Sequence, residues 1–460
     1  MKSNKIGDTL KMIRKYDKKS IKTNKISVEF SDLNLTNYAG LVPVAEFLFK
    51  KLDFFKALKI HLFLPLRNNF TFHNYQIFST IIFGYLCSYR RIVHFEELSK
   101  DRVIQKILGL RKYVDENTIG RRLKQFTFKN SHQLTEVTHF LQRKVHRSAQ
   151  IFPSQRQIVD IDSSVKGVYG SQEGAAIGYN DKKKGQKSYH PILAFLKSTK
   201  ECLHSWYRPG NTYTGNGAAE FIKECFERLP GKDYSYLFRA DSGFFDDKLL
   251  STVEEYGASY LVKVKLKNLR SLLTKQTWFS IPGLNGIEYC EFFYQCHGWK
   301  SPRKFVGLRI LKEILREDRL FEEYIYDNHC FVVNFEEAPI EIYQLYRDRA
   351  ECENWIEAVK QQIGAGFTNV DHFWANDTLW QLGVLAYNIT IWMRYLTCSE
   401  GDPRVGKSWR QEPNTFRNWF IHTAGKLVCH AGQYLLKLPK YHPYRKDWWS
   451  IYEKVLCLQI

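Results

Sequence analysis

The sequence predicts an α/β fold in which a mainly helical N-terminal region precedes a largely parallel sheet. Apolar residues recur at helical spacing from residue 42 to about residue 150. After residue 154 the pattern changes to short β-branched runs that alternate with amphipathic segments. Of the 460 residues, 44% are hydrophobic and 25% are charged, as in globular proteins of roughly two to four structural units.

The order of elements after residue 154 indicates how the sheet is connected. The expected elements are strands at 157–164, 190–197 and 202–207, a helix at 217–229, a strand at 234–240, a helix at 246–256 and a strand at 258–265. Two successive strand–helix–strand crossovers imply parallel strands with helices packed on the faces of the sheet. This order is the one used by the ribonuclease H fold, in which the first and fourth strands are neighbours. Asp162 and Asp241, at the ends of those strands, are therefore expected to lie close together.

A polar stripe on a later helix, expected over residues 343–361, adds a third carboxylate. The members of the stripe are Tyr346, Arg349, Glu353 and Lys360. Their offsets bring them to nearly the same side of an α-helix. A carboxylate flanked by two cations and a phenol suits a site that holds a phosphate and a divalent metal together. The alternative is a solvated helix face on which Arg349 and Glu353 form an ordinary ion pair.

The segment between the last core strand and this helix is too long for a simple connection. About eighty strand-like and aromatic residues lie there, which predicts a β-rich insertion before the last catalytic helix. A long apolar helix follows the stripe. The expected regions are a helical DNA-binding region with a basic arm at 1–150, a ribonuclease H-like core at 151–267 and 336–400, the β-rich insertion at 268–335, and a basic aromatic C-terminal region at 401–460.

The charge of the chain predicts a polyanionic partner. The formal net charge is +20, and the basic residues are spread along the chain rather than gathered in one tail. Nucleic acid is the commonest polyanion for such a protein. Residues 114–124 are typical of a capped helix start that leads into a basic helix, so Arg121 and Arg122 are expected to contact DNA. The alternative is a helical bundle with a basic surface.

The cysteine pattern argues against a zinc finger and against a secreted disulfide framework. The ten cysteines include no CxxC pair, and Cys290, Cys296 and His297 lack a second ligand pair at zinc-finger spacing. Scattered cysteines without a secretory signal indicate buried thiols in a cytoplasmic protein. The most apolar run, residues 75–89, is shorter than the ~20 residues of a membrane span and predicts a core helix.

Three carboxylates brought together by this fold predict metal-dependent chemistry on phosphodiesters. Asp162, Asp241 and Glu353 would concentrate negative charge, which a divalent cation neutralises. Carboxylate oxygens without Cys or His partners suit Mg²⁺ or Mn²⁺. Two such ions about 3.5–4 Å apart hold the attacking and leaving oxygens of an in-line phosphoryl displacement. Asp160 precedes Asp162 on the same side of the strand and is interpreted as a structural or supporting acid.

Three motifs occur in order on these elements. They are Asp162-Ser163-Ser164, Asp241-Ser242-Gly243, and the pattern Y-x2-R-x3-E-x6-K at Tyr346, Arg349, Glu353 and Lys360. With them, the chain resembles the DDE transposases of bacterial insertion sequences, in the IS4-like superfamily, and is most similar to the IS1380 group. The segments GSQEGAAIGYNDKKKGQKSYHP and FTNVDHFWAN resemble the same group. Ser164 departs from the threonine found in many members of the superfamily.

The resemblance implies a DNA transposase with Asp162, Asp241 and Glu353 as catalytic residues and ligands of two Mg²⁺ or Mn²⁺ ions. Water attacks at the end of the element and frees a 3′-hydroxyl, which then attacks a second phosphodiester. Tyr346, Arg349 and Lys360 are implied to hold phosphates near a flipped base. The implied partners are double-stranded DNA, at terminal inverted repeats and target sites, and a second copy of the chain. A cytoplasmic, nucleoid-associated location is implied.

Two further segments are expected to contact DNA. The basic residues Lys182, Lys183, Lys184 and Lys187 lie between the first two core strands, at the edge of the presumed site. Trp299, with Arg303 nearby on the insertion, could stack on an unpaired base, an interaction worth ~1–3 kcal/mol. The alternatives are a solvated charge run and an ordinary buried tryptophan.

Two other functions are compatible with these patterns. A metal-dependent nuclease of the same fold would cleave DNA without joining it. A transposase-derived DNA-binding protein would have lost catalysis, but the three acids and the helix motif argue against it.

Overall fold

The computed structural model describes residues 34–66, 68–147, 155–178, 180, 183–231, 234–315, 323–397 and 412–460. The chain divides into two compact units, Met1–Asn34 and Leu35–Ile460. All elements described below belong to the second unit. The predicted basic arm lies outside the described residues, apart from its last two positions.

The helical region predicted for residues 42–150 is confirmed. Its elements are α2 (Leu41–Glu46), the π-helical turn η2 (Phe47–Lys51), α3 (Phe54–His61), α4 (Asn74–Leu86), α5 (Ile92–Ser99), α6 (Arg102–Leu108), α7 (Glu116–Leu123) and α8 (Phe128–His146). The apolar run predicted as a core helix is α4, which is buried from Gln76 to Leu86. Helices α4 and α8 both pack against α14 (Phe373–Thr397), which is itself almost wholly buried. No helix in the described part is long and apolar enough to cross a membrane.

A nine-stranded mixed sheet has the order β10-β11-β12-β13-β9-β8-β2-β6-β7. Its core elements are β2 (Arg156–Ser163), β6 (Ile192–Leu196), β7 (Cys202–Trp206), α9 (Ala218–Arg228), β8 (Ser235–Ala240), the 3-10 turn η3 (Ser242–Phe244), α10 (Asp247–Glu255) and β9 (Ser259–Lys263). Every core element predicted between residues 157 and 265 is present, within two residues of its expected bounds. The pairs β2–β8 and β8–β9 are parallel, as the two crossovers require.

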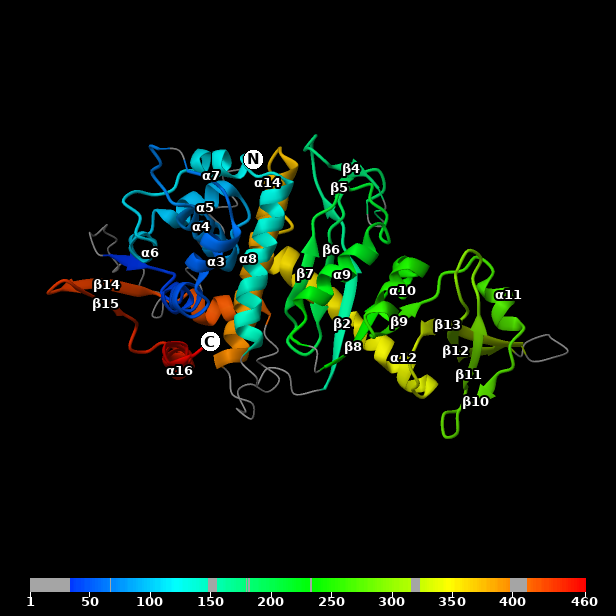
Figure 1. The fold of residues 1–460 in the computed structure, drawn as a ribbon. Coiled ribbons are helices and arrows are strands. Elements are labelled where there is room, and N and C mark those ends of the chain that lie inside the picture. Colours follow the sequence, from blue (N-terminus) through cyan, green and yellow to red (C-terminus); the bar gives the residue numbers. More distant parts are fainter. Residues whose placement is uncertain are drawn as a thin grey trace, which may run out of the picture. The chain divides into compact units, whose positions relative to one another are not determined.

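Helices cover both faces of this sheet. Leu237 of β8 lies in one apolar cluster with Ile342 of α12 (Pro339–Arg347), whereas the next residue, Phe238, contacts Phe226 of α9. Alternate residues of a strand point to opposite faces. Helices α12 and α9 therefore lie on opposite sides of the sheet, with α9 and α10 in front of it and yellow α12 behind it in Figure 1.

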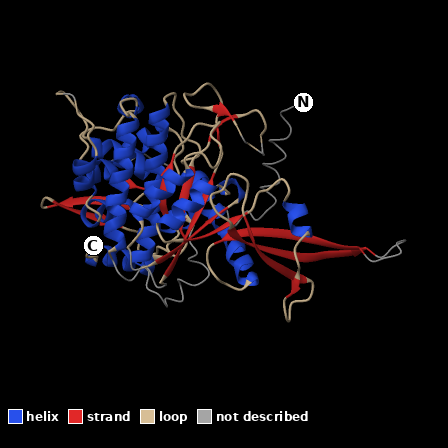
Figure 2. Ribbon diagram, turned by 45° about the vertical axis from the view of Figure 1, so that its right-hand side comes forward, coloured by secondary structure: helices blue, strands red, loops and turns tan. Residues whose placement is uncertain are grey.

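The predicted insertion is made of strands, and these strands extend the core sheet. It contains α11 (Leu269–Thr274), β10 (Phe279–Ser280), β11 (Ile287–Tyr294), β12 (Arg303–Leu315) and β13 (Glu323–Val333). Strand β13 pairs antiparallel with β9, which joins the insertion to the core. Figure 2 shows these strands, in red, extending away from the helices.

The helix predicted over residues 343–361 is present, but it is not a uniform α-helix. The chain instead forms α12, a 3-10 turn η4 (Asp348–Ala350), α13 (Glu351–Glu357) and a π-helical turn η5 (Ala358–Ile363). Gly364, with φ of 100°, ends the segment in a conformation that favours glycine. The helix type thus changes on both sides of Glu353, and π-helical turns of this kind occur frequently at functional sites.

Two small sheets and a C-terminal helix complete the second unit. The C-terminal elements are α15 (Pro413–Phe416), the π-helical turn η7 (Arg417–Ile421), β14 (Gly425–His430), β15 (Gln433–Lys437) and α16 (Arg445–Cys457). Strand β14 pairs with β15 and also with β1 (Leu35–Thr36). The other small sheet, β3 (Lys166–Gly167), β5 (Lys187–Tyr189) and β4 (Ala176–Ile177), begins three residues beyond the end of β2.

The prediction of buried, unpaired thiols is largely confirmed. Seven of the nine described cysteines are buried and free, while Cys429 and Cys457 are exposed and free. Cys398 lies outside the described residues.

Candidate active site

The ends of β2 and β8 bring two of the predicted acids together. The strands run parallel with Ile161 opposite Ala240, so the next step in this register places Asp162 opposite Asp241. Asp241 also caps η3, because its side chain accepts a hydrogen bond from the backbone N–H of Gly243 at 2.9 Å. Both carboxylates are thus held at the carboxyl ends of neighbouring parallel strands.

Glu353, on α13, belongs to the same electrostatic cluster. Burial, together with the charges of Asp241 and Glu353, raises the pKa of Asp162 to about 6, although the charge of Arg349 opposes this shift. Burial also raises the pKa of Tyr346 to about 12, with added contributions from the same three carboxylates. A carboxylate shifts the pKa of another group by its charge only when the two groups lie close together. The three acids predicted from the sequence therefore converge on one region, where Glu353 is exposed and the two aspartates are half-buried.

Arg349 supplies a positive charge inside this cluster. Its side chain is buried, and Nη2 lies 3.0 Å from Oδ2 of Asp162. The same nitrogen donates to the carbonyl oxygen of Ile161 at 3.4 Å. Burial lowers the pKa of Arg349, but the surrounding charges, of which that of Asp162 is the largest, together offset this effect and hold the pKa above its ordinary value. Within the described part, Nε of Arg349 has no hydrogen-bond partner.

Tyr346 and Lys360 flank the acids on the same segment. The ring of Tyr346 packs against Phe331 of β13, with centroids 4.8 Å apart. The Nζ atom of Lys360 donates to Oγ of Ser164 at 2.8 Å and to the carbonyl oxygen of Val165 at 2.6 Å. Lys360 thus holds the chain just after the Asp162 motif, and it lies in the π-helical turn that directly follows the α-helix carrying Glu353.

Asp160 has the structural role that the sequence favoured for it. Its carboxylate is fully buried and accepts two hydrogen bonds from Arg239 of β8, at 2.6 and 2.7 Å. Arg239 also donates to the carbonyl oxygen of Leu345 on α12. This ion pair fastens β2 to β8 and both strands to α12, directly beneath the acid cluster.

The donor chemistry of the cluster fits a hard divalent cation, but the present spacing does not form a finished cage. Three carboxylates offer the oxygen ligands that Mg²⁺ and Mn²⁺ prefer. Across the described ranges, no three His, Cys, Asp or Glu side chains lie close enough to share one ion. In this conformation the guanidinium of Arg349, rather than a metal, balances the charge of Asp162.

Two residues beside Asp241 were not found from the sequence. Arg208 is buried and donates to the carbonyl oxygens of His190, Thr214 and Asn216, which holds the loop after β7 in place. Burial lowers the pKa of His190, and the charge of Asp241 opposes this shift. Neither residue belongs to a motif, and only the fold brings them to the end of β8.

The predicted basic loop is exposed where it is described. Lys183, Lys184 and Lys187 are all exposed, and Nζ of Lys183 donates to the hydroxyl of Tyr169 at 3.0 Å. Lys182 lies outside the described residues. The loop belongs to the small sheet that follows the Asp162 motif, so it lies at the same end of β2 as the acids.

The other predicted DNA contacts differ in exposure. Arg121 is exposed on α7, whereas Arg122 is buried and donates to the carbonyl oxygen of Pro65. Arg303 is also buried. It pairs with Asp247 at 2.5 Å and with Glu254 at 3.0 Å, both on α10. In this conformation Arg122 and Arg303 therefore form contacts within the protein and do not lie on a surface that could face DNA.

Trp299 is half-buried against the core. Its ring packs on Phe245 at 4.9 Å, and the guanidinium of Arg303 lies 4.8 Å from its centroid. These contacts fit the alternative of a packed tryptophan, and base stacking by Trp299 stays a prediction.

Comparison with known proteins gives the family. Among solved structures, the piggyBac transposase synaptic complex with hairpin DNA is 11% identical, with a TM-score of 0.43 over 84% of this chain and 80% of that chain. The Mos1 transposase paired-end complex with left transposon end is 8% identical, with a TM-score of 0.17 over 44% of this chain and 60% of that chain. No curated protein matches the sequence. The family model described as Transposase DDE domain group 1 matches residues 18–459. Because this match spans nearly the whole chain, the protein belongs to the family of DDE transposases.

Proposed function

We propose that this chain is the transposase of a bacterial insertion sequence of the IS1380 group and that its core is ribonuclease H-like. The observation that carries the proposal is the convergence of Asp162, Asp241 and Glu353 from two parallel strands and a packed helix in a chain of the DDE family. The strand order β7-β6-β2-β8-β9 supports the ribonuclease H-like core.

In the proposed reaction, the chain's own residues position the phosphodiester and the metal. Asp162, Asp241 and Glu353 would hold two Mg²⁺ or Mn²⁺ ions, which would supply Lewis acidity and lower the pKa of water. Arg349 contacts Oδ2 of Asp162, so it would give up this contact if a cation bound at that oxygen. Its guanidinium then becomes free for a phosphate oxygen, in keeping with the role expected for Arg349 and Lys360.

The proposed substrate is double-stranded DNA at the ends of the element and at a target site. The net charge of +20 and the exposed lysines 183, 184 and 187 support DNA binding, because they can neutralise phosphates without reading sequence. Pairing of two element ends further requires at least two copies of the chain.

The test is an excision and strand-transfer assay with Asp241→Asn. Asparagine keeps the acceptor that binds the N–H of Gly243 but removes the charge. We expect excision from a plasmid to fall by at least about 10³-fold while DNA binding is retained. Asp246→Asn is the matched control, since Asp246 caps α10 through the N–H of Leu249 and takes no part in the acid cluster.

A pre-cut 3′-end distinguishes transposase from nuclease. Products longer than the input support strand transfer, whereas shortened products alone would identify a nuclease. Tight DNA binding without Mg²⁺-dependent nicking by the wild type would instead identify a DNA-binding protein that has lost catalysis.

A further inference from the structure

A large hollow lies beside the C-terminal hairpin, on elements that carry none of the three acids. Its volume is about 1130 Å³, and α2, α6, β14, β15 and α16 all contribute to it. Its lining residues are Val42, Val103, Lys106, Ile107, Leu427, Tyr434, Leu435, Leu436, Leu438, Pro439, Lys440, His442, Arg445, Lys446, Trp448, Trp449, Ser450, Tyr452 and Glu453. A small-molecule pocket measures roughly 300–1,000 Å³, so this hollow is large enough for a segment of a polymer.

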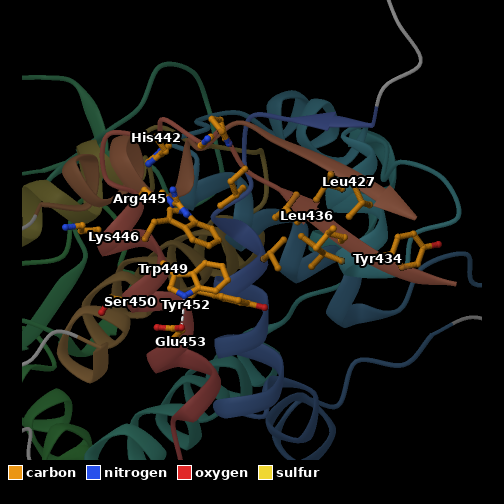
Figure 3. Close-up of a pocket in the computed structure, with 18 of the residues that line it drawn as sticks. Leu427, Tyr434, Leu436, His442, Arg445, Lys446, Trp449, Ser450, Tyr452 and Glu453 are labelled. Atoms are coloured by element: carbon orange, nitrogen blue, oxygen red, sulfur yellow. Dashed lines mark hydrogen bonds between the residues drawn. The ribbon is translucent and has the colours of Figure 1, made fainter. Parts of the chain in front are cut away.

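The floor of the hollow is apolar, and two of the aromatic residues that line it are open to solvent. The Trp449 side chain is 53% exposed and that of Tyr434 is 51% exposed. In Figure 3 the indole of Trp449 stands between Arg445 and Lys446 on one side and Leu436 on the other. Exposed rings of this size on the wall of one hollow indicate a surface that a partner covers.

The rim of the hollow is strongly cationic. Lys106, Lys440, Arg445 and Lys446 line it, and within the described chain none of them forms an ion pair. The single carboxylate among the lining residues, Glu453, accepts a hydrogen bond from Nε1 of Trp449 at 2.5 Å. Nζ of Lys106 lies 4.1 Å from the ring centroid of Tyr434, so charge and aromatic surface are already in contact.

This chemistry favours a polyanion with planar apolar groups. A second copy of the chain also carries a net charge of +20, so it would meet like charge at this rim. A DNA duplex presents phosphates but keeps its bases stacked inside, where the exposed rings of Trp449 and Tyr434 cannot reach their faces. Unpaired nucleotides present both phosphates and base faces, which is the combination that basic aromatic grooves bind.

We infer that this hollow binds single-stranded DNA, with bases stacked on Trp449 and Tyr434 and phosphates held by Lys440, Arg445 and Lys446. The choice of DNA over RNA rests on the proposed function, whereas binding of unpaired nucleotides rests on the hollow alone. The site needs no divalent metal, because none of the lining residues belongs to the acid cluster. It can therefore be tested in EDTA, whether or not the chain cleaves DNA.

The experiment measures fluorescence anisotropy of a labelled oligo-dT of about 20 nucleotides with the full-length protein in EDTA, beside a duplex of equal length. We expect Trp449→Ala and Tyr434→Ala each to weaken oligo-dT binding by roughly ten-fold to a hundred-fold and duplex binding by much less. Phe63→Ala is the matched control, since Phe63 is 74% exposed and does not line the hollow.

A charge variant provides a second measurement. Lys440→Gln combined with Lys446→Gln should reduce the slope of log affinity for oligo-dT against log salt concentration by roughly 1.4, as expected when two phosphates are no longer neutralised. Thermal melts of each variant show that the fold is retained.

Four outcomes would overturn the inference, each at a different point. Oligo-dT affinity unchanged in both aromatic variants would show that the rings do not stack on bases. Equal losses for oligo-dT and duplex would show that the hollow does not select unpaired nucleotides. If light scattering gave a smaller mass for Trp449→Ala than for the wild-type protein, and oligo-dT binding were kept, the hollow would be an interface between copies of the chain. Stronger binding of oligo-rU than of oligo-dT would overturn the assignment to DNA.

Discussion

Arg349 keeps the acid cluster stable while no metal is bound. Asp162, Asp241 and Glu353 repel one another, and the guanidinium of Arg349 lies 3.0 Å from Asp162 and offsets part of that repulsion. In such a site, a divalent metal ion would take over from the guanidinium of Arg349 in balancing the charge of the carboxylates.

Removing one charge of the cluster should stabilise the metal-free protein. Asp241 raises the pKa of Asp162, which means that the two ionised side chains repel each other. In EDTA at pH 8, we expect Asp241→Asn to increase the free energy of unfolding by on the order of 1 kcal/mol, measured by urea denaturation. At pH 5, where Asp162 is largely protonated, the gain should shrink. A loss of stability at pH 8 would contradict this account of the cluster.

Removing Arg349 should shift the pH dependence of cleavage. A carboxylate binds a cation in its ionised form, so Mg²⁺-dependent cleavage by the wild type should rise as the pH increases through about 6, the pKa of Asp162. Arg349 lowers that pKa, so Arg349→Ala should move the rise in cleavage to higher pH, and Arg349→Lys should move it less. The measurement is the initial rate of plasmid nicking between about pH 5 and about pH 9. This range runs from about one pH unit below that pKa to about three units above it. Identical profiles for the wild type and Arg349→Ala would rule out this role.

At the scale of elements, the insertion is attached to the core by an ion-pair network as well as by strand pairing. Arg303, at the start of β12, is buried and pairs with Asp247 and Glu254 of α10, while β13 pairs with β9. The insertion is therefore anchored at the base of β12 and along the end of β13.

The variant Arg303→Ala tests whether Arg303 anchors the insertion to the core or contacts DNA. The substitution leaves two carboxylates of α10 without their partner, so we expect a loss of stability on the order of 2–4 kcal/mol. Duplex affinity, measured at a temperature where the variant is folded, should change by less than about three-fold, or roughly 0.7 kcal/mol. A large loss of DNA affinity with unchanged stability would restore Arg303 as a phosphate-binding residue.

Local pattern was enough to predict the two strands at whose ends Asp162 and Asp241 lie, and the helices between them. Short β-branched runs and amphipathic helices set β2, β8, α9 and α10, and the crossover rule then placed Asp162 beside Asp241. The changes of helix type on both sides of Glu353 could not be predicted, because residues 343–361 contain no proline or glycine. Tertiary contacts determine it, such as the bonds of Lys360 to the chain after β2.

Burial decides which cations can meet DNA, and the sequence does not reveal burial. Arg121 and Arg122 are neighbours on α7, but the first is exposed and the second is buried. The C-terminal hollow could likewise not be predicted from local sequence pattern, because the residues that line it are as far apart in the sequence as Val42 and Glu453.

At the scale of the whole molecule, the net charge of +20 sets how strongly binding depends on salt. If the protein binds six or more phosphates, its affinity for duplex DNA should fall by about 10³-fold or more between about 50 mM and about 200 mM salt. Replacing lysines 183, 184 and 187 by alanine should lower the slope of log affinity against log salt by roughly 0.9 for each phosphate that these lysines neutralise. Filter binding over a salt series measures both quantities. A slope that is unaffected by the triple substitution would show that this loop stays in solvent.

The pairing of β13 with β9 has a mechanical consequence. Strand β9 is bonded to β8, and Asp241 directly follows β8, so β12 and β13 are linked to this carboxylate through continuous backbone ladders. A ladder of this kind resists shear much better than a flexible tether does. A displacement of β13 would thus be transmitted through β9 and β8 to the backbone that carries Asp241.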